Sequence, residues 1–220
     1  MPNIDLLLGA DPSRKRSVRT EPTQRRSTQR LDALLDAAAE IVDETGFERL
    51  TTQMVAERAG ASIGTVYRYF PDRVAVLHAL RERSIRRFRE RVADEMEQAE
   101  LTTWWDVVDV ALDAGAALYR DEPGFSVVHL SRRETADDGV EPEFADRLAN
   151  LIEAEFELEA DSAEFRFRLG LAIELGDALI SRAFERDPSG DERYLAEAKR
   201  LVHHYLAEHL GEARAASSAA

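Results

Sequence analysis

Hydrophobic residues recur with helical spacing along almost the whole chain, and no run alternates with the period of two that marks a half-buried strand. In residues 28–45 the apolar positions form one stripe, and the acidic positions lie off it. Gly46 follows as a residue that turns left-handed at little cost, which is typical of a helix end. The pattern predicts an all-α fold.

Further helices are predicted from the same periodicity and from their capping residues. Asp72 is placed to cap a long fourth helix, and the Asp187–Gly190 segment separates the last two helices. The other predicted helices cover residues 52–59, 63–70, 103–120, 125–132, 142–157, 162–186 and 191–210. We therefore predict a flexible basic arm over residues 1–27, an N-terminal domain over 28–71, a C-terminal helical domain over 72–211 and a loose tail over 212–220.

The two short helices at 52–59 and 63–70 are separated by only three residues. Ala56 is small where the helices would cross, and Gly60 can adopt a positive φ in the turn. This arrangement predicts a helix-turn-helix, whose second helix enters the major groove of DNA.

Polar residues fall on the second of these helices where DNA would lie. Thr65 and Arg68 share a face, and Tyr67 and Tyr69 flank it. Ser62 begins the helix, where the N–H groups near Ile63 and Gly64 would attract phosphate; Gly64 permits close approach, and Ile63 suits a thymine methyl. The competing interpretation for the two tyrosines is core packing. For Arg68 it is a solvated surface position without a role.

The chain from about Thr28 to Leu80 resembles the TetR family of transcriptional regulators. The resemblance rests on Gly46-Phe47, Leu50-Thr51-Thr52, Val55-Ala56, Ala59-Gly60, Gly64 to Tyr67 and Tyr69-Phe70-Pro71. It implies an all-helical homodimer with a DNA-binding domain of three helices and a larger domain that dimerises and binds a small molecule. It also implies DNA contacts, mainly with phosphates, by Thr52, Ser62, Gly64, Thr65, Tyr67, Tyr69 and Arg73. Ile63 departs from the lysine that many members carry.

The predicted helix over residues 162–186 is apolar on two sides, which indicates burial on both. One stripe would face its own domain and the other a partner chain, as in a four-helix interface with two-fold symmetry. The predicted dimer interface comprises Phe165, Leu169, Ala172, Gly176, Leu179, Ala183, Leu201 and Tyr205. The alternative is a monomer with a deeply buried central helix.

A ligand pocket in the C-terminal domain is marked only by aromatic residues and by acids among apolar stripes. The candidate lining residues are Trp104, Phe125, His129, Phe144, Phe156, Glu174 and Asp177. For each aromatic residue, ordinary core packing is the competing interpretation. Glu174 and Asp177 would need a partner if buried, which a cationic ligand, an arginine such as Arg182 or water would supply.

The net charge of −14 over 220 residues is unevenly distributed. Residues 1–91 carry 17 basic and 13 acidic residues, whereas residues 92–220 carry 12 and 30. This asymmetry predicts a basic contact module joined to an acidic body. The basic arm would follow phosphates or enter a minor groove, or else be a solvated tail. The basic residues are almost all arginine, because Lys15 and Lys199 are the only lysines. Genome composition explains this bias as well as a DNA-binding role does.

Several classes are excluded by what the sequence lacks. It contains no cysteine, so disulfides, zinc fingers and thiol nucleophiles are excluded. Adjacent His203 and His204 point about 100° apart on a helix and do not suit one metal ion. We find no Gly-rich phosphate loop, no Gly-x-Ser-x-Gly elbow and no apolar run of membrane-spanning length. We expect a cytoplasmic protein that is not an enzyme and uses no cofactor or metal.

These observations predict a repressor that a small molecule releases from a near-palindromic DNA operator. One alternative is a regulator that responds to a protein partner or acts as an activator. Another is a helical enzyme with an appended DNA-binding anchor.

Overall fold

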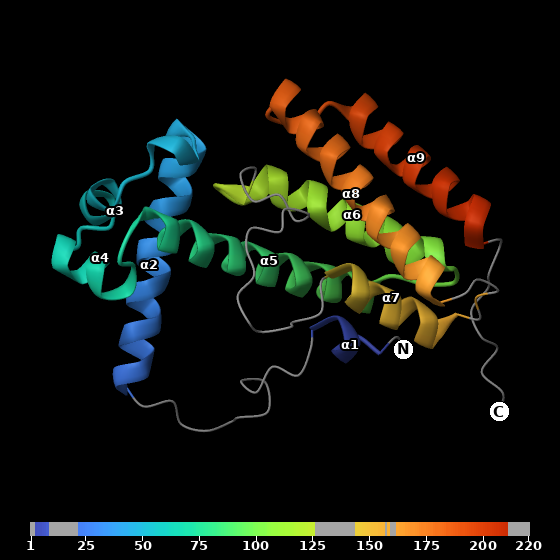
Figure 1. Cartoon of the computed structure of the whole chain (residues 1–220), viewed down its shortest axis with the longest axis horizontal. Coiled ribbons are helices and arrows are strands. Elements are labelled where there is room, and N and C mark those ends of the chain that lie inside the picture. Colours follow the sequence, from blue (N-terminus) through green and yellow to red (C-terminus); the bar gives the residue numbers. More distant parts are fainter. Residues whose placement is uncertain (1–2, 9–21, 126–143, 157, 159–161, 211–220) are drawn as a thin grey trace. The chain divides into compact units, whose positions relative to one another are not determined.

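The computed structural model describes residues 3–8, 22–125, 144–156, 158 and 162–210, and within these ranges it contains helices and no β-strand (Figure 1). The elements are α1 (Asp5–Leu8), α2 (Pro22–Thr45), the 3-10 turn η1 (Phe47–Arg49), α3 (Thr52–Arg58), α4 (Ile63–Tyr69), α5 (Arg73–Gln98), α6 (Trp104–Asp121), α7 (Phe144–Glu155), α8 (Ser162–Arg186) and α9 (Glu192–Leu210). The all-α prediction is confirmed. Most predicted helices agree within two residues, but the one predicted at 125–132 lies outside the described residues beyond Phe125.

The chain divides into two compact units, Pro12–Arg86 with Asp121–His129 (the N-terminal unit) and Met1–Asp11 with Arg87–Arg120 and Leu130–Ala220 (the body). The predicted boundary at residue 71 is wrong, because the division falls inside α5. Val76 and Leu80, in the first half of α5, are buried in the same core as α2, α3 and α4. The first turns of α5 therefore complete the N-terminal unit.

The core of the N-terminal unit follows the predicted stripe of α2. Leu34, Ala38 and Ile41 are buried against Val55 of α3 and Val66 of α4. On the surface, the Arg58 guanidinium bonds to Glu44 at 2.6 Å and to Glu40 at 3.0 Å, which joins α3 to α2. This packing fixes the crossing of the two short helices.

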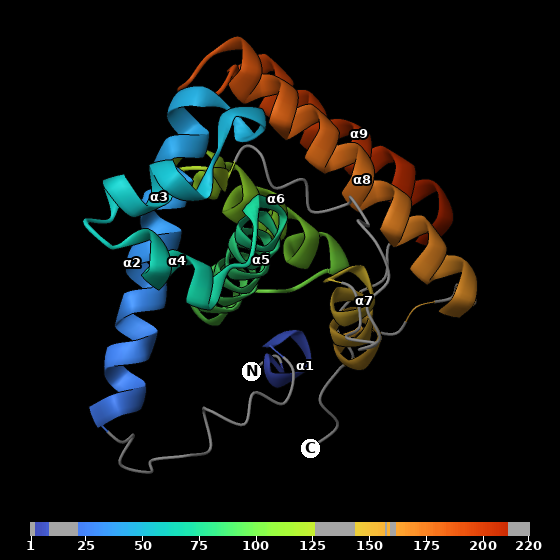
Figure 2. The ribbon, with the colours of Figure 1, turned by 60° about the vertical axis from the view of Figure 1, so that its left-hand side comes forward.

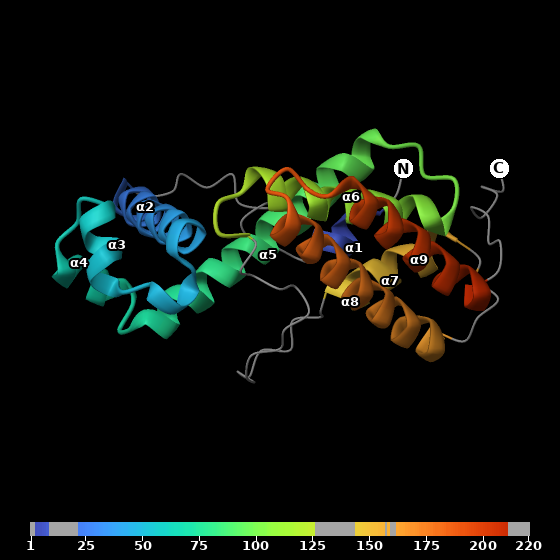
Figure 3. The ribbon, with the colours of Figure 1, turned by 90° about the horizontal axis from the view of Figure 1, so that it is seen from above.

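The prediction of an unstructured arm over residues 1–27 is wrong at both of its described parts. Residues 5–8 form α1, whose Leu7 is fully buried, and α1 packs against α7 in the body (Figure 3). The backbone N–H of Asn3 also donates to Glu155 Oε1 at 2.8 Å. At the other end, α2 begins at Pro22 rather than Thr28, as proline suits the first turn of a helix. Residues 9–21 of the predicted arm lie outside the described residues.

Helices α8 and α9 run side by side in the body (Figures 1 and 2). In this contact the buried Gly176 of α8 lies against the buried Val202 of α9. Lys199 of α9 bonds to both Asp109 and Asp113 of α6 at 2.8 Å, which joins α9 to α6. The described helices are too short or too polar for any of them to cross a bilayer.

Candidate nucleic-acid interface and cavity

The turn between α3 and α4 is held by backbone hydrogen bonds at its glycine. Gly60 has φ of +60°, its N–H donates to Glu57 O at 3.3 Å, and the N–H of Ala61 donates to Ala56 O at 2.9 Å. These two bonds form the Schellman motif, which ends α3 and satisfies its last carbonyl groups. The predicted role of Gly60 is therefore confirmed, and the motif sets the direction in which α4 begins.

Helix α4 is capped by a side chain at its first turn. Ser62 Oγ accepts the N–H of Thr65 at 3.2 Å and lies 2.9 Å from Thr65 Oγ1. The cap satisfies one of the N–H groups that lack a partner within the helix. At the start of α3, Thr51 Oγ1 accepts the N–H of Met54 in the same way, at 3.1 Å.

The surface of α4 presents a tyrosine and an arginine to solvent. Tyr67 is 53% exposed, and Arg68 and Gly64 are also exposed. The Arg68 guanidinium lies 5.2 Å from the centroid of the Tyr69 ring, within the range of a cation–π contact. The core interpretation of Tyr67 is therefore wrong, and its side chain is free of the unit's core.

Tyr69 is half-buried and packs against the core of the N-terminal unit. Its phenolic oxygen lies 3.2 Å from Ser27 Oγ of α2, and this hydrogen bond is the main cause that lowers the pKa of Tyr69. Sequence reasoning missed Ser27, because it began this helix at Thr28, whereas α2 begins at Pro22. Tyr69 thus joins the last turn of α4 to the first half of α2.

The remaining predicted contact residues lie at the edges of this surface. Ile63 is half-buried against the core, and Thr52 is a half-buried residue in the first turn of α3. Arg73 is exposed and donates to the carbonyl oxygen of Glu48 at 2.8 Å, so it joins the start of α5 to η1. Contact of any of these residues with DNA stays a prediction.

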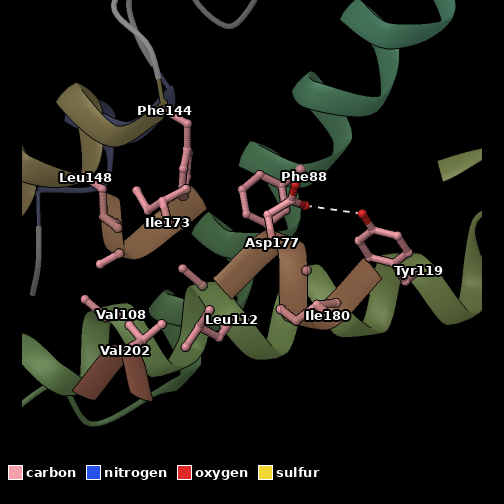
Figure 4. A pocket seen from close by; sticks show the side chains of 13 residues that line it. Phe88, Val108, Leu112, Tyr119, Phe144, Leu148, Ile173, Asp177, Ile180 and Val202 are labelled. Carbon is pink, nitrogen blue, oxygen red and sulfur yellow. Dashed lines mark hydrogen bonds between the residues drawn. The ribbon is translucent and has the colours of Figure 1, made fainter. Parts of the chain in front are cut away.

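The body contains a cavity of about 40 Å³. It lies among α5, α6, α7, α8 and α9, and the described residues that line it are Phe88, Val108, Ala111, Leu112, Gly115, Tyr119, Phe144, Leu148, Ala172, Ile173, Asp177, Ile180 and Val202 (Figure 4). Tyr119 donates its hydroxyl hydrogen to Asp177 Oδ1 at 3.2 Å, and both residues are buried. Burial and the charge of Asp177 raise the pKa of Tyr119.

Two of the predicted pocket residues, Phe144 and Asp177, line this cavity. Trp104 is buried outside it and stacks on His203, with ring centroids 5.9 Å apart, because its side of α6 faces α9. Phe125 and Phe156 are buried and do not line it, and Glu174 is exposed. These four predictions are wrong for this cavity, and His129 lies outside the described residues. Sequence reasoning missed Tyr119, whose signal was a polar group on the apolar face of α6.

The predicted dimer stripe of α8 is directed into the body of its own chain. Phe165, Leu169, Ala172 and Ala183 are buried there, and a Cβ at Gly176 would lie 2.7 Å from Leu112 Cδ2. These five assignments to an interface are therefore wrong. The partly exposed residues Leu179, Leu201 and Tyr205 remain predictions.

The second apolar stripe of α8 is the exposed one. Phe167, Leu171 and Leu175 are respectively 58%, 39% and 36% exposed, at a spacing of four residues that places them on one face. Large apolar side chains at this spacing form an apolar patch of the kind that marks protein–protein contacts.

Comparison with known proteins identifies the class. Residues 34–80 match the model of bacterial regulatory proteins of the tetR family, and residues 102–210 match a tetracyclin repressor-like C-terminal domain. The crystal structure of a TetR-family transcriptional regulator from Streptomyces coelicolor shares 33% identity and a TM-score of 0.67, over 83% of this chain and 98% of that one. The chain belongs to the TetR family of transcriptional regulators, as its sequence indicated.

Two curated repressors are similar over shorter lengths. The HTH-type transcriptional repressor KstR of Rhodococcus jostii is 36% identical over 29% of this chain and 30% of its own length. The tetracycline repressor protein class D of Escherichia coli is 30% identical over 65% of each chain. The chain thus aligns with less than two thirds of each of these repressors.

Proposed function

We propose that this protein is a sequence-specific, DNA-binding transcriptional repressor that a small molecule in the body releases from its operator. The observation that carries the proposal is the exposed surface of α4, where Tyr67 and Arg68 project from a helix held by its Ser62 cap and by Tyr69. Family membership supports DNA binding, and the two curated repressors support repression. Binding to DNA would place the protein in the cytoplasm.

Dimerisation would use the exposed stripe of α8. Phe167, Leu171 and Leu175 would meet the same residues of a second chain about a two-fold axis, and Leu179, Leu201 and Tyr205 would lie at the edge of the contact. Two recognition helices related by this axis would read a near-palindromic operator.

Release by a ligand would be a shift between two populations of the dimer. Occupation of the body cavity would favour a state in which the two α4 helices no longer match the spacing of the half-sites. Helix α5 is the natural transmitter, because its residues 73–86 belong to the N-terminal unit and Phe88 in its second half lines the cavity.

Selection of bound DNA from a random library by the full chain tests the proposal. We expect a near-palindromic site, and we expect Arg68→Ala to weaken binding by about 1–3 kcal/mol and to relax preference at one base position per half-site. Arg200→Ala on α9, which removes an exposed arginine paired with Glu197, is the matched control. Failure to enrich any sequence would contradict the proposal. If the protein bound at its site recruits RNA polymerase instead of excluding it, the result would favour an activator over a repressor.

A further inference from the structure

The cavity in the body has one polar pair in an apolar lining. Among its described lining residues, Asp177 and Tyr119 supply the polar side chains, and Asp177 carries the only charge. Figure 4 shows Leu148, Val108 and Val202 on one side of Asp177 and Tyr119 on the other. A ligand on the apolar side of Asp177 therefore meets apolar surface along its length and a carboxylate where it ends.

We propose that the ligand is a slender apolar molecule that ends in a single hydrogen-bond donor, a hydroxyl or a protonated amine, which Asp177 accepts. The proposal rests on the proposed function in taking this cavity as the ligand site. A carboxylate offers about four lone-pair positions, so Asp177 can accept a ligand donor while it still accepts the hydroxyl of Tyr119. A donor that is bonded there loses little on leaving water.

The same geometry selects against acids. A ligand carboxylate would bring a second negative charge beside Asp177 in an apolar, buried site, where like charges repel strongly and neither is well solvated. A carboxylate would also compete with Asp177 for the single hydroxyl hydrogen of Tyr119. Asp177 is thus the residue that determines specificity between donors and acids.

The small volume of the cavity favours a ligand whose apolar part is slender. A volume of about 40 Å³ holds only a few atoms, so a ligand must displace lining side chains on entry. Phe144 of α7 and Ile173 of α8 are half-buried members of the lining. Phe144 packs edge-on against Phe88 with ring centroids 4.6 Å apart. An alkyl chain can enter by moving this aromatic pair, whereas a broad ring system would separate the helices.

Three probes with the same apolar chain test the proposal: n-octylamine, 1-octanol and sodium octanoate. Their binding to the full chain is measured at neutral pH, without DNA, by titration calorimetry and by the shift in Tm. We expect the amine and the alcohol to bind and the octanoate to bind at least about tenfold more weakly, a difference of ~1.4 kcal/mol. Equal binding of octanoate, or no binding by any probe, would overturn the proposal.

Substitution of the carboxylate separates charge from shape. Asp177→Asn should abolish the preference for amine over octanoate and retain the alcohol, while Asp113→Asn, an exposed acid of α6 paired with Lys199, should leave the preference intact. If Asp177→Asn fails to fold, Tyr119→Phe gives the second test, because the preference for donors should persist without the phenol. An unchanged preference in folded Asp177→Asn would refute the assignment. These binding measurements contain no DNA, so they test the ligand class alone. If the donors bind but do not release an operator in a separate DNA-binding assay, that result would contradict the proposed function and not the ligand class.

Discussion

The phenolic oxygen of Tyr69 and the hydroxyl of Ser27 lie 3.2 Å apart and join the recognition helix α4 to α2. Family resemblance suggests Tyr69 as a DNA contact, whereas the structure gives its hydroxyl a partner within the protein. The two roles are compatible, because a residue that orients α4 also positions the exposed Tyr67 and Arg68.

A double-mutant cycle on this pair measures its positioning role. We expect Tyr69→Phe and Ser27→Ala each to weaken operator binding, since either removes the bond, and the double variant to be no weaker than the worse single variant. Binding would be measured by fluorescence anisotropy at fixed salt. Additive losses would mean that the two hydroxyls act separately, for example on different phosphates.

Substitutions on opposite sides of α8 should have different effects. Gly176→Leu should overpack the contact with Leu112 and lower the free energy of unfolding by about 1–3 kcal/mol. Leu171→Glu, on the exposed stripe, should leave the fold intact and convert dimer to monomer, because it places a charge in the proposed interface. Sedimentation and urea unfolding distinguish the two effects. A fully dimeric Leu171→Glu protein would place the interface elsewhere.

The buried side chain of Leu7 should stabilise the body although it lies near the start of the chain. Leu7→Ala should lower the free energy of unfolding by about 2–5 kcal/mol, toward the lower end because a four-residue helix can readjust. Leu8→Ala, at a partly exposed position, is the matched control and should cost less. Equal effects in urea unfolding would contradict the prediction that burial of Leu7 causes the larger loss.

The basic residues between α1 and α2 can be tested without removing α1. Replacing Arg14, Lys15, Arg16 and Arg19 with glutamine keeps Leu7 in place, which deletion of residues 1–27 would not. If these residues neutralise phosphates, the slope of log affinity against log salt should become shallower by about 0.9 for each lost contact. An unchanged slope would mean that the segment does not contact DNA.

The raised pKa of Tyr119 predicts a loss of stability in alkali. Burial and the charge of Asp177 favour the protonated phenol in the folded state, so its contribution is complete below the unfolded pKa of about 10. Above that pH the contribution should fall by up to about 1.4 kcal/mol per pH unit. Tyr119→Phe should lack this term, so its difference from wild type in urea unfolding should change between pH 9 and 11 and stay constant between pH 7 and 8.5. A constant difference throughout would contradict the prediction.

Most of the helices and the helix-turn-helix could be predicted from the amino-acid sequence alone. Their signals are local: the stripe of α2, the capping serine at 62, the glycine at 60 and the proline at 71 act within a few residues of their own positions. The resemblance to the TetR family rested on the same segment. The same local signals did not predict α1 or the first turns of α2, which lie in the segment predicted as an unstructured arm.

The inward face of α8 and the pairing of its buried polar group depend on how the helices pack. Both stripes of α8 are apolar, so periodicity does not distinguish them. Gly176 lies on the inward face, where Leu112 leaves no room for a side chain. Likewise, Tyr119 and Asp177 are 58 residues apart in the chain, and only the packing of α6 against α8 joins them. Long-range contacts of this kind depend on how helices pack, which no local pattern records.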